Sequence, residues 1–299
     1  MKLAAIDIGS NAARLLISEA SVDENGKPSF TKLSLVRVPL RLGFDVFDTG
    51  LISDKKVGLL VLTIKGFLNI AKAYEVSALK ACATSAMRDA VNKTEIISLI
   101  KKETGLEIEV ISGGDEASFL FESHIAENLD KDHSYLYIDV GGGSTELTFF
   151  SNNNLVFKES FPIGTIRLLK DQVSEETWNE MKFCIKSKTK GFKAVEAIGS
   201  GGNINKVFTI SKRKEGKPLP YELLSDYYKE LSNVSLKDRM NIYKLKEDRA
   251  DVIVPALKIY ISAMRWAGSQ QIYVPKIGLA DGLIQHLWGE QNRKEKSDG

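Results

Sequence analysis

The hydrophobic and polar positions at the start of the chain predict a β-hairpin. Lys2 to Ile8 is mostly apolar, which predicts a buried strand; Gly9-Ser10-Asn11 is a polar turn, and Ala12 to Ala20 is a second strand. An acid, Asp7, lies at the end of the first strand, next to the turn.

A second copy of this hairpin occurs later in the chain. Tyr135 to Val140 predicts a strand, Gly141-Gly142-Gly143-Ser144 a turn, and Thr145 to Phe150 a second strand. At a separation of 132 residues, Ile6-Asp7-Ile8-Gly9 matches Ile138-Asp139-Val140-Gly141. Internal repetition of this kind usually reflects a repeated structural unit, so we expect one copy in each of two domains.

After each hairpin we expect a further strand and then alternating helices and strands. The predicted helices are Ser53 to Tyr74, Lys93 to Thr104, Glu116 to Asn128, Trp178 to Lys188, Gly202 to Ile210, Leu219 to Ser232 and Asp248 to Trp266; the predicted strands are Val76 to Ala83, Leu106 to Ser112, Ala194 to Ile198 and Gln271 to Val274. This order predicts an α/β fold in which each sheet has an antiparallel edge and parallel strands flanked by helices.

The chain length favours two domains. At 299 residues we place the first domain at 1–122 and the second at 123–299, with the last helix packing back on the first domain. Apolar residues make up 43% and charged residues 27%, as in ordinary globular proteins. A net charge of +2 argues against a general nucleic-acid binder, although ten basic residues from Lys182 to Lys217 form either a solvated surface or a polyanion track.

Cysteine usage and hydropathy indicate the compartment. Cys82 and Cys184 are far apart and in no metal-ligand spacing, which fits a reducing environment. No run of about 18 apolar residues occurs, so we expect no membrane span and a cytoplasmic protein. The apolar positions from Leu257 to Trp266 would suit a homodimer interface.

The two hairpin turns are candidate phosphate loops. A tight turn of small residues exposes successive backbone N–H groups, which bind phosphate oxygens. Gly141 to Ser144 is the stronger candidate, and Gly9-Ser10-Asn11 replaces glycine with side-chain donors. A single copy would be read as an ordinary turn, but two copies that each follow an Asp favour a phosphate site.

Carboxylates near these loops predict a divalent metal site. Mg²⁺ prefers hard oxygen ligands and needs only one or two carboxylates beside phosphate oxygens. Asp139 is our first choice as a ligand, followed by Glu146 and Asp7.

Three strand-to-helix junctions carry further candidates. Thr84 and Ser85 place two hydroxyl groups at a predicted helix start, where they form either an ordinary N-cap or part of a phosphate site. Arg88 follows one turn later with a guanidinium suited to phosphate. Asp115 and Glu116 lie at a helix start, where they either stabilise the helix dipole or activate a water. The Gly-rich turn that includes Gly201, Gly202 and Asn203 is a weak signal for an anion or nucleoside loop.

Taken in order, these segments resemble the exopolyphosphatase and guanosine pentaphosphate phosphohydrolase family of the actin-like superfamily. The matching segments are Ala5 to Asn11 with Arg14-Leu15, Leu40 to Gly43, Ala83 to Ala90 with Asn92, Ile111 to Gly113 with Glu116-Ala117, Asp139 to Leu147, and Phe161 to Gly164. The resemblance covers nearly the whole chain and implies two ribonuclease-H-like domains around an interdomain cleft.

The resemblance also implies roles for individual residues. Glu116 would be the general base, and Asp139 and Glu146 the metal-associated acids for Mg²⁺ or Mn²⁺. The implied phosphate contacts are Ser10, Asn11, Arg88, Gly141, Gly142, Gly143 and Ser144; Gly201, Gly202 and Asn203 would form a distal or nucleoside loop. The chain departs from the family pattern at Ala12, where Ser is usual, at Asn203, where Thr is usual, and at Ala280-Asp281, where Arg-Glu is usual.

The expected function is release of terminal phosphate from inorganic polyphosphate or guanosine pentaphosphate. One alternative is an ATP-dependent small-molecule kinase of the same superfold, and another is a non-catalytic sensor of polyphosphate or an alarmone. The sequence leaves open the preferred substrate, the chain-length preference, the native metal and the oligomeric state. A fold alone does not decide among these, because one fold hosts many reactions.

Overall fold

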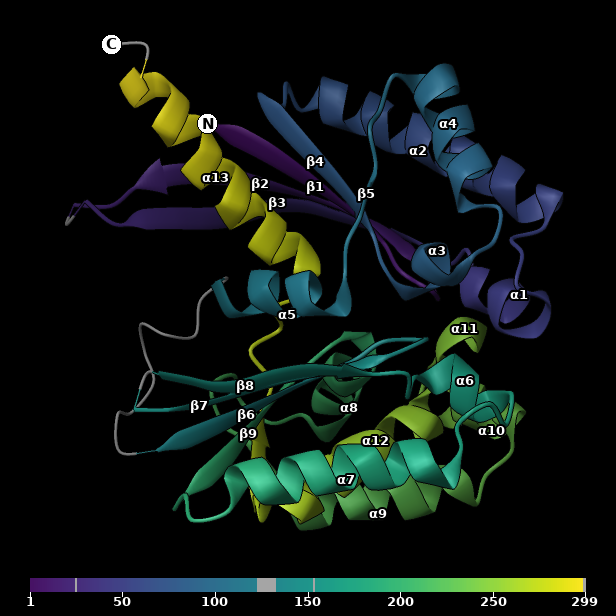
Figure 1. Ribbon diagram of the computed structural model, residues 1–299, viewed down its shortest axis with the longest axis vertical. Helices are drawn as coiled ribbons and strands as arrows, with labels where there is room; N and C mark the ends of the chain where they lie inside the picture. The colour runs from purple at the N-terminus through teal and green to yellow at the C-terminus, as the bar shows by residue number, and fades with distance from the viewer. Residues whose placement is uncertain (25, 123–132, 153, 298–299) are drawn as a thin grey trace. The chain divides into compact units, whose positions relative to one another are not determined.

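The computed structural model describes residues 1–24, 26–122, 133–152 and 154–297, and it divides the chain into two compact units (Figure 1). Unit 1 consists of Met1–His124 with Gly278–Gly299, and unit 2 of Ile125–Ile277. The expected boundary after residue 122, and the end of the helix expected from Glu116 to Asn128, adjoin residues 123–132, which lie outside the described residues.

Unit 1 is built on a five-stranded sheet. Its elements are β1 (Lys2–Ile8), β2 (Ala13–Val22), β3 (Pro28–Val38), α1 (Leu42–Thr49), α2 (Asp54–Ala73), β4 (Ala78–Ala83), α3 (Ser85–Asp89), α4 (Lys93–Thr104), β5 (Glu109–Val110), α5 (Gly113–Glu122) and the C-terminal α13 (Leu279–Ser297). The strand order is β3-β2-β1-β4-β5.

Unit 2 is built on a six-stranded sheet. Its elements are β6 (Ser134–Val140), β7 (Thr145–Ser151), β8 (Asn154–Phe161), α6 (Thr165–Leu169), α7 (Glu175–Thr189), β9 (Val195–Ser200), α8 (Gly202–Ser211), β10 (Leu219–Pro220), α9 (Tyr221–Ser232), α10 (Leu236–Ile242), α11 (Glu247–Ala250), α12 (Ile253–Ala267) and β11 (Gln271–Tyr273). The strand order is β10-β11-β9-β6-β7-β8.

The two sheets share one topology. In unit 1 the first three strands are antiparallel neighbours, and β4 and β5 add to β1 in parallel. In unit 2 the strands β6, β7 and β8 are antiparallel, and β9 and β11 add to β6 in parallel. The predicted α/β fold class is therefore confirmed, with β10 as one additional antiparallel edge strand in unit 2.

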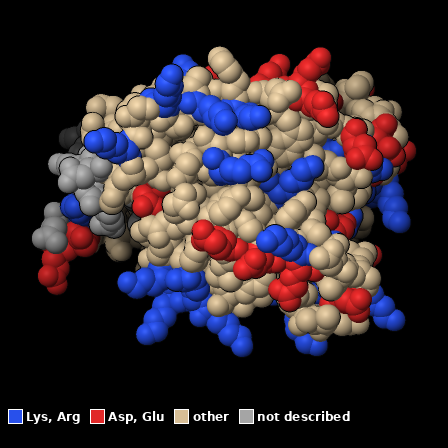
Figure 2. Space-filling model, turned by 90° about the horizontal axis from the view of Figure 1, so that it is seen from below, with Lys and Arg blue, Asp and Glu red and all other residues tan. Residues whose placement is uncertain are grey.

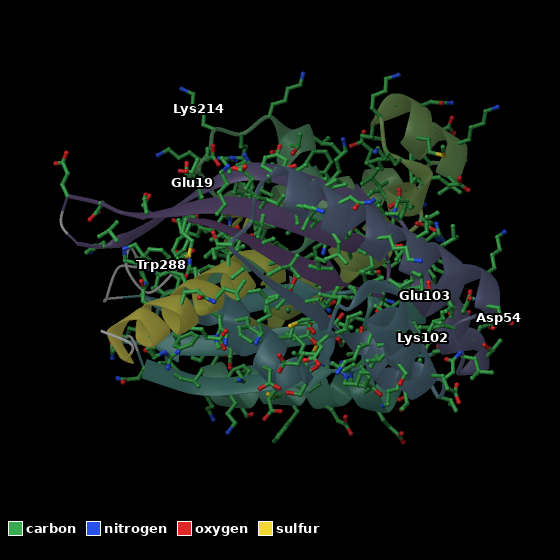
Figure 3. The ribbon with its side chains drawn as sticks, turned by 90° about the horizontal axis from the view of Figure 1, so that it is seen from above. Glu19, Asp54, Lys102, Glu103, Lys214 and Trp288 are labelled. Carbon is green, nitrogen blue, oxygen red and sulfur yellow. The ribbon has the colours of Figure 1, made fainter. Side chains whose placement is uncertain are left out.

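The C-terminal helix completes the core of unit 1. In Figure 1, α13 crosses the strands of the first sheet. Its buried residues Leu279, Leu283 and Ile284 pack in one cluster with Leu3 and other strand residues. Trp288, labelled in Figure 3, sets its ring edge-to-face against Phe30 of β3, with ring centres 6.3 Å apart.

One predicted helix was wrong in its extent. The segment Asp248 to Trp266 was expected to be a single helix, but α11 ends at Ala250 and α12 begins at Ile253. Pro255 has no backbone N–H, so a continuous helix would lose the bond to residue 251. Beginning the helix at Ile253 puts the proline in the first turn, where no such bond is needed.

The apolar face of the helix that we proposed for a homodimer interface is buried within its own unit. Leu257, Tyr260, Ala263 and Met264 of α12 are each at most 1% exposed and belong to the core of unit 2. This apolar face therefore packs on the sheet and helices of its own unit.

The face of the protein drawn in Figure 2 is mixed in charge. Figure 2 shows basic and acidic side chains interspersed over one face, as the small net charge leads one to expect. Among the described helices, none combines the length and apolar character that crossing a bilayer requires.

Replacing Leu283 with alanine should destabilise unit 1. Leu283 is fully buried between α13 and the sheet, so Leu283→Ala leaves a cavity and should cost about 2–5 kcal/mol of unfolding free energy. Urea denaturation measures this change. Leu62→Ala on α2 is the matched control because Leu62 is 66% exposed; an equal loss in both variants would contradict the packing role assigned to α13.

Candidate active site

The two predicted phosphate loops are closed in the same way. The Gly9 amide donates to the Ala12 carbonyl at 3.1 Å, and the Gly141 amide donates to the Ser144 carbonyl at 2.9 Å. These residues correspond at the separation of 132 found in the sequence. The internal repeat is therefore a repeated strand–turn–strand structure and not only a repeated composition.

The start of α6 supports the glycine loop of unit 2 from one side. The amides of Thr165 and Ile166 donate to the carbonyls of Gly141 (3.0 Å) and Gly142 (2.8 Å). The Arg167 Nε donates to the Gly143 carbonyl at 2.8 Å. Because N–H and C=O of one peptide unit point in opposite directions, the loop amides are turned away from α6 and are available to an anion.

Close packing at Gly164 keeps this arrangement. A Cβ atom at Gly164 would overlap the backbone of Gly142 and Gly143, so only glycine fits at the junction before α6. The Thr145 hydroxyl donates to the Ile163 carbonyl at 2.5 Å and ties the same junction to β7. The glycine loop is therefore a rigid turn.

The loop of unit 1 is supported in a similar way by the start of α1. The Gly43 amide donates to the Ser10 carbonyl at 2.8 Å, and the Arg41 amide donates to the Asn11 carbonyl at 2.9 Å. The Ser10 and Ser85 hydroxyls are 2.8 Å apart and buried. Two segments that the sequence singled out separately, the first turn and the start of α3, thus meet.

The acids beside the two loops face residues of opposite charge sign on the neighbouring strand. In unit 1, strand register places Asp7 opposite Arg14, and Arg14 Nη1 is 2.5 Å from Asp7 Oδ2. In unit 2, the same register places Asp139 opposite Glu146. The first hairpin is thus neutral at this position, whereas the second carries two carboxylates.

The carboxylate pair in unit 2 suits a hard cation. A carboxylate oxygen of Asp139 and one of Glu146 lie within 4.8 Å of each other. Glu146 is 2% exposed, and its Oε1 accepts a hydrogen bond of 2.9 Å from the Ser160 hydroxyl. Like charges at this separation repel, and a divalent cation with an oxygen-ligand preference removes that repulsion. The residues present therefore fit the predicted metal.

Glu116 is placed near the start of α5 in unit 1. The neighbouring Asp115 accepts from the Ser112 hydroxyl at 2.6 Å and from the Ser112 amide at 3.2 Å, while the Asp115 amide donates to the Ser112 hydroxyl at 3.1 Å. This reciprocal cap accounts for Asp115 structurally. Glu116 is only 9% exposed and has no part in that side-chain cap.

The position of α5 is fixed by α13. A Cβ atom at Gly282 would overlap the Phe119 carbonyl, so the two helices approach as closely as glycine allows. The Phe119 ring also packs edge-to-face on His286, with ring centres 5.2 Å apart. Because Phe119 lies one turn after Glu116, the C-terminal helix sets where the Glu116 carboxylate is held.

The Gly-rich loop before α8 contains an arginine contact that sequence reasoning missed. Gly201 has φ 103°, and a Cβ atom at Gly202 would overlap the guanidinium of Arg249. Arg249 Nη1 donates to Asn203 Oδ1 at 3.1 Å. Arg249 is 46 residues from Asn203 in sequence and lies in a segment expected to be helical, so no local signal linked it to the loop.

Tyr260 supports the same loop from within the core. Its hydroxyl donates to the Ser200 carbonyl. Burial, and secondarily the nearby Asp139 carboxylate, raise the pKa of Tyr260 well above its ordinary value. The hydroxyl therefore stays protonated and remains a donor.

The remaining candidates and departures also have defined surroundings. Arg88 Nη1 donates to the Ile111 carbonyl at 3.0 Å, which fixes the guanidinium near the end of β5. Ala12 is 2% exposed and its carbonyl closes the first loop. Ala280 is 5% exposed and lies in the α13 cluster of unit 1, while Asp281 pairs with Lys32 at 2.7 Å.

Enlarging Gly164 should disturb the glycine loop. Gly164→Ala forces the backbone of Gly142 and Gly143 to move, which should cost about 1–3 kcal/mol of stability and weaken phosphate binding. Gly66→Ala is the control: Gly66 lies inside α2 with no atom within 4 Å of a new Cβ, so it should gain roughly 0.5–1 kcal/mol. Urea denaturation and calorimetric titration with phosphate measure both effects; unchanged binding by Gly164→Ala would contradict this account of the loop.

Two relatives illustrate the sequence similarity. Exopolyphosphatase 1 of Mycobacterium tuberculosis is 26% identical over 304 residues, covering 95% of this chain and 87% of its own. The bifunctional 3-dehydroquinate synthase/phosphatase of Fusobacterium nucleatum is 27% identical over 248 residues, covering 80% of this chain and 35% of its own.

Solved structures establish the fold independently. An exopolyphosphatase from Cytophaga hutchinsonii matches with a TM-score of 0.82 at 24% identity, over 96% of this chain and 97% of that chain. The Aquifex aeolicus member of the Ppx/GppA family matches with a TM-score of 0.74 at 24% identity, over 97% and 98%. The model of the Ppx/GppA phosphatase family matches residues 21–290, and the chain therefore belongs to the Ppx/GppA phosphatase family.

Proposed function

We propose that this protein is a divalent-metal-dependent exopolyphosphatase that releases the terminal phosphate of inorganic polyphosphate. The observation that carries the proposal is the pairing of Asp139 with Glu146 beside a glycine loop whose carbonyls are already bonded to α6. Cation ligands and anion-binding amides next to each other suit a metal–phosphate complex. Family membership and the exopolyphosphatases among the relatives support this choice of substrate.

Each of the two loops would bind phosphate oxygens of the substrate. In unit 2 the amides of Gly142, Gly143 and Ser144 would donate to phosphate oxygens, while the Gly141 amide closes the turn on the Ser144 carbonyl. In unit 1 the donors would be Ser10, Asn11 and Arg88. Phosphoryl transfer depends mainly on positioning and on stabilising the charge of the phosphoryl oxygens. The rigid support of both loops by the starts of α1 and α6 provides that positioning.

Asp139 and Glu146 would hold Mg²⁺ or Mn²⁺, which when bound neutralises phosphate charge and polarises the phosphoryl group. Asp7 corresponds to Asp139 by position, but its carboxylate is paired with Arg14. We therefore assign Asp7 a supporting role in the first hairpin and place metal binding on the unit 2 pair.

Glu116 would act as the general base. It orients a water and takes its proton while the water oxygen forms a bond to the terminal phosphorus. The bond between that phosphorus and the bridging oxygen breaks, and the shortened chain leaves with the bridging oxygen. Helix α5, held by α13, keeps the carboxylate in one place during this step.

Guanosine pentaphosphate is the second substrate that this site chemistry admits, since it also ends in a condensed phosphate. Gly201, Gly202 and Asn203 would then contact the part of the substrate that is not transferred. Arg249, bonded to Asn203, adds a positive charge at that loop.

Removing the base should abolish turnover. Glu116→Gln keeps the size of the side chain but cannot accept a proton, so phosphate release from long-chain polyphosphate with Mg²⁺ should fall by roughly 10²- to 10⁴-fold. A colorimetric phosphate assay measures the rate, with guanosine pentaphosphate and ATP as comparison substrates. Glu107→Gln is the control, because Glu107 is 78% exposed and pairs with Lys101.

The outcomes of this assay separate the candidate functions. Metal-dependent release that is lost in Glu116→Gln and retained in Glu107→Gln supports the phosphatase and identifies its substrate. If wild-type protein binds polyphosphate and releases no phosphate, the result contradicts the enzyme proposal and favours a sensor.

Metal binding can be tested without turnover. Glu146→Gln removes one negative charge from the pair, so calorimetric titration should show Mg²⁺ affinity reduced on the order of 10- to 100-fold. Glu159→Gln serves as the comparison, because Glu159 is exposed on the adjacent strand β8. Equal Mg²⁺ affinity in wild type and Glu146→Gln would show that the pair does not hold the metal.

A further inference from the structure

Four oxygen-bearing side chains lie in one row across the sheet of unit 2. Strand register sets Asp139 of β6 opposite Glu146 of β7 on one side and opposite Ser200 of β9 on the other. Glu146 is in turn opposite Ser160 of β8. Residues paired in register point to the same face of a sheet, so these four residues form a polar row across four adjacent strands.

The polar row lies on the face of the sheet that points away from the core of unit 2. Ile138 and Val140 flank the member of the row on β6, Leu147 follows the member on β7, and Ala197 lies three positions before the member on β9. All four belong to the buried core cluster of unit 2. Because successive side chains of a strand point to opposite faces, the row belongs to the other face.

The hydroxyl of Ser200 is buried without a hydrogen bond. Ser200 is 9% exposed, and its Oγ has no hydrogen-bond partner among the described residues. The backbone carbonyl of the same residue accepts from the Tyr260 hydroxyl, so the unsatisfied group is the side chain alone. Such a group is unfavourable in a folded protein, and native structures contain few of them. The Ser200 hydroxyl is therefore a candidate for binding a ligand.

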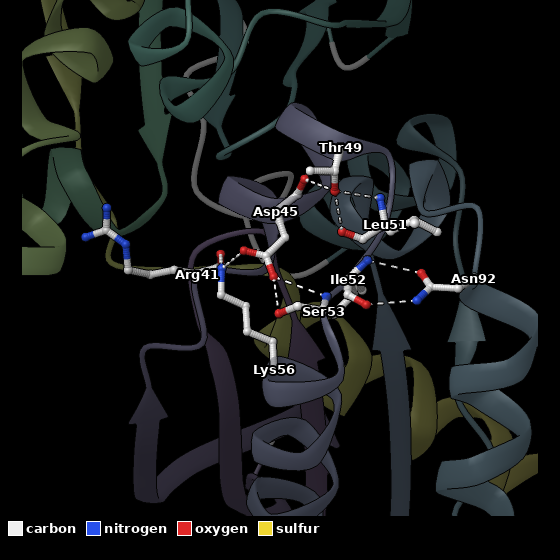
Figure 4. Close-up of polar contacts among 8 residues, drawn as sticks. All are labelled: Arg41, Asp45, Thr49, Leu51, Ile52, Ser53, Lys56 and Asn92. Carbon is white, nitrogen blue, oxygen red and sulfur yellow. Dashed lines mark hydrogen bonds and ion pairs between the residues drawn. The ribbon is translucent and has the colours of Figure 1, made fainter.

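Serine hydroxyls that lie beside carboxylates elsewhere in the chain donate to them. Ser160, at the β8 end of the polar row, donates to the adjacent glutamate at 2.9 Å. Ser53 donates to Asp45 Oδ2 at 2.6 Å in unit 1 (Figure 4). In the described part of unit 2, Ser200 makes no such bond to Asp139, although the two residues are paired in register. Its oxygen is therefore open to a cation.

The carboxylate of Asp139 reaches toward the end of β9. Gly201 follows Ser200, and a Cβ atom at Gly201 would lie only 3.1 Å from Asp139 Oδ1. A carboxylate oxygen of Asp139 is also within 4.8 Å of one of Glu146. Asp139 thus lies between the Glu146 carboxylate and the strand end that carries the Ser200 hydroxyl.

A hydroxyl oxygen beside two carboxylates has a charge that suits a metal–phosphate site. Mg²⁺ and Mn²⁺ prefer hard oxygen ligands, and a serine hydroxyl is one of these. Two carboxylates already balance the charge of a divalent cation. A third carboxylate would repel the phosphate that the cation must attract, whereas a neutral hydroxyl adds a ligand without adding charge.

We propose that Ser200 is a third protein ligand of the divalent cation: its Oγ binds the cation held by Asp139 and Glu146. The inference rests on the proposed function, because it presupposes that cation site. It adds a ligand from the start of the Gly-rich loop before α8, so that the bound cation links β9 to the hairpin of β6 and β7.

Calorimetric titration of the metal-free protein with Mg²⁺ tests this role without turnover. Ser200→Ala should bind Mg²⁺ roughly tenfold more weakly. Its melting temperature without metal should not fall, because the hydroxyl that is removed forms no hydrogen bond within the described structure. Ser134→Ala is the matched control: Ser134 is buried at the start of β6, and its hydroxyl donates to Ser151 at 3.0 Å. This control should melt at a lower temperature and bind Mg²⁺ as wild type does.

Exchange of the ligand atom tests direct contact with the cation. Ser200→Cys places sulfur where the hydroxyl oxygen was, and sulfur prefers soft cations to Mg²⁺. Relative to wild type, this variant should bind Cd²⁺ roughly tenfold more tightly and Mg²⁺ more weakly. Ser134→Cys introduces the same thiol at the other end of β6 and should leave both affinities unchanged.

Each outcome decides the inference. Equal Mg²⁺ affinity of wild type and Ser200→Ala overturns it, and so does a Ser200→Cys variant that gains no affinity for Cd²⁺. If Ser200→Ala melts at a lower temperature, the cysteine variant decides, because damage to the fold would not create a preference for Cd²⁺.

Failure of this inference is distinguishable from failure of the proposed function. Mg²⁺ binding that is weakened in Glu146→Gln and unchanged in Ser200→Ala overturns the role of Ser200 and leaves the proposed cation site standing. A wild-type protein that binds no Mg²⁺ overturns both.

Discussion

The placement of two like charges on neighbouring strands is the constraint on which the site of unit 2 depends. Strand register sets Asp139 opposite Glu146, whereas the same register in unit 1 sets Asp7 opposite Arg14. Opposed carboxylates repel each other, while an acid opposite an arginine is stabilised. A hairpin that keeps the unfavourable pair next to a glycine loop is therefore suited to a cation and the anion that accompanies it.

The rest of each unit keeps the polar groups in place. The glycine loop is bonded through its carbonyls to the start of α6, and Gly164 admits no side chain at that contact. In unit 1 the first loop is bonded to the start of α1, and α5 is held against α13 by the close approach at Gly282. Chemistry that depends on positioning requires such support, because phosphoryl transfer needs charges fixed before the substrate arrives.

Much of the fold could be predicted from local sequence patterns. The strand–turn–strand units, their repetition and the succession of helices and strands were predicted because side-chain periodicity and glycine-rich turns depend on neighbours in sequence. The prediction failed where a local pattern had two solutions. The apolar period from Asp248 to Trp266 fits one helix, but Pro255 makes a new helix start at Ile253 the lower-energy choice.

The sequence by itself determined the hairpins, their acids, the glycine loops and the α/β class, because each of these depends on residue types at short spacing. Only the tertiary structure decided that Arg249 meets Asn203 and that Arg41 adopts a left-handed backbone beside the first loop. These outcomes depend on contacts between residues distant in sequence, where packing and strand register, and not local propensity, fix which groups meet.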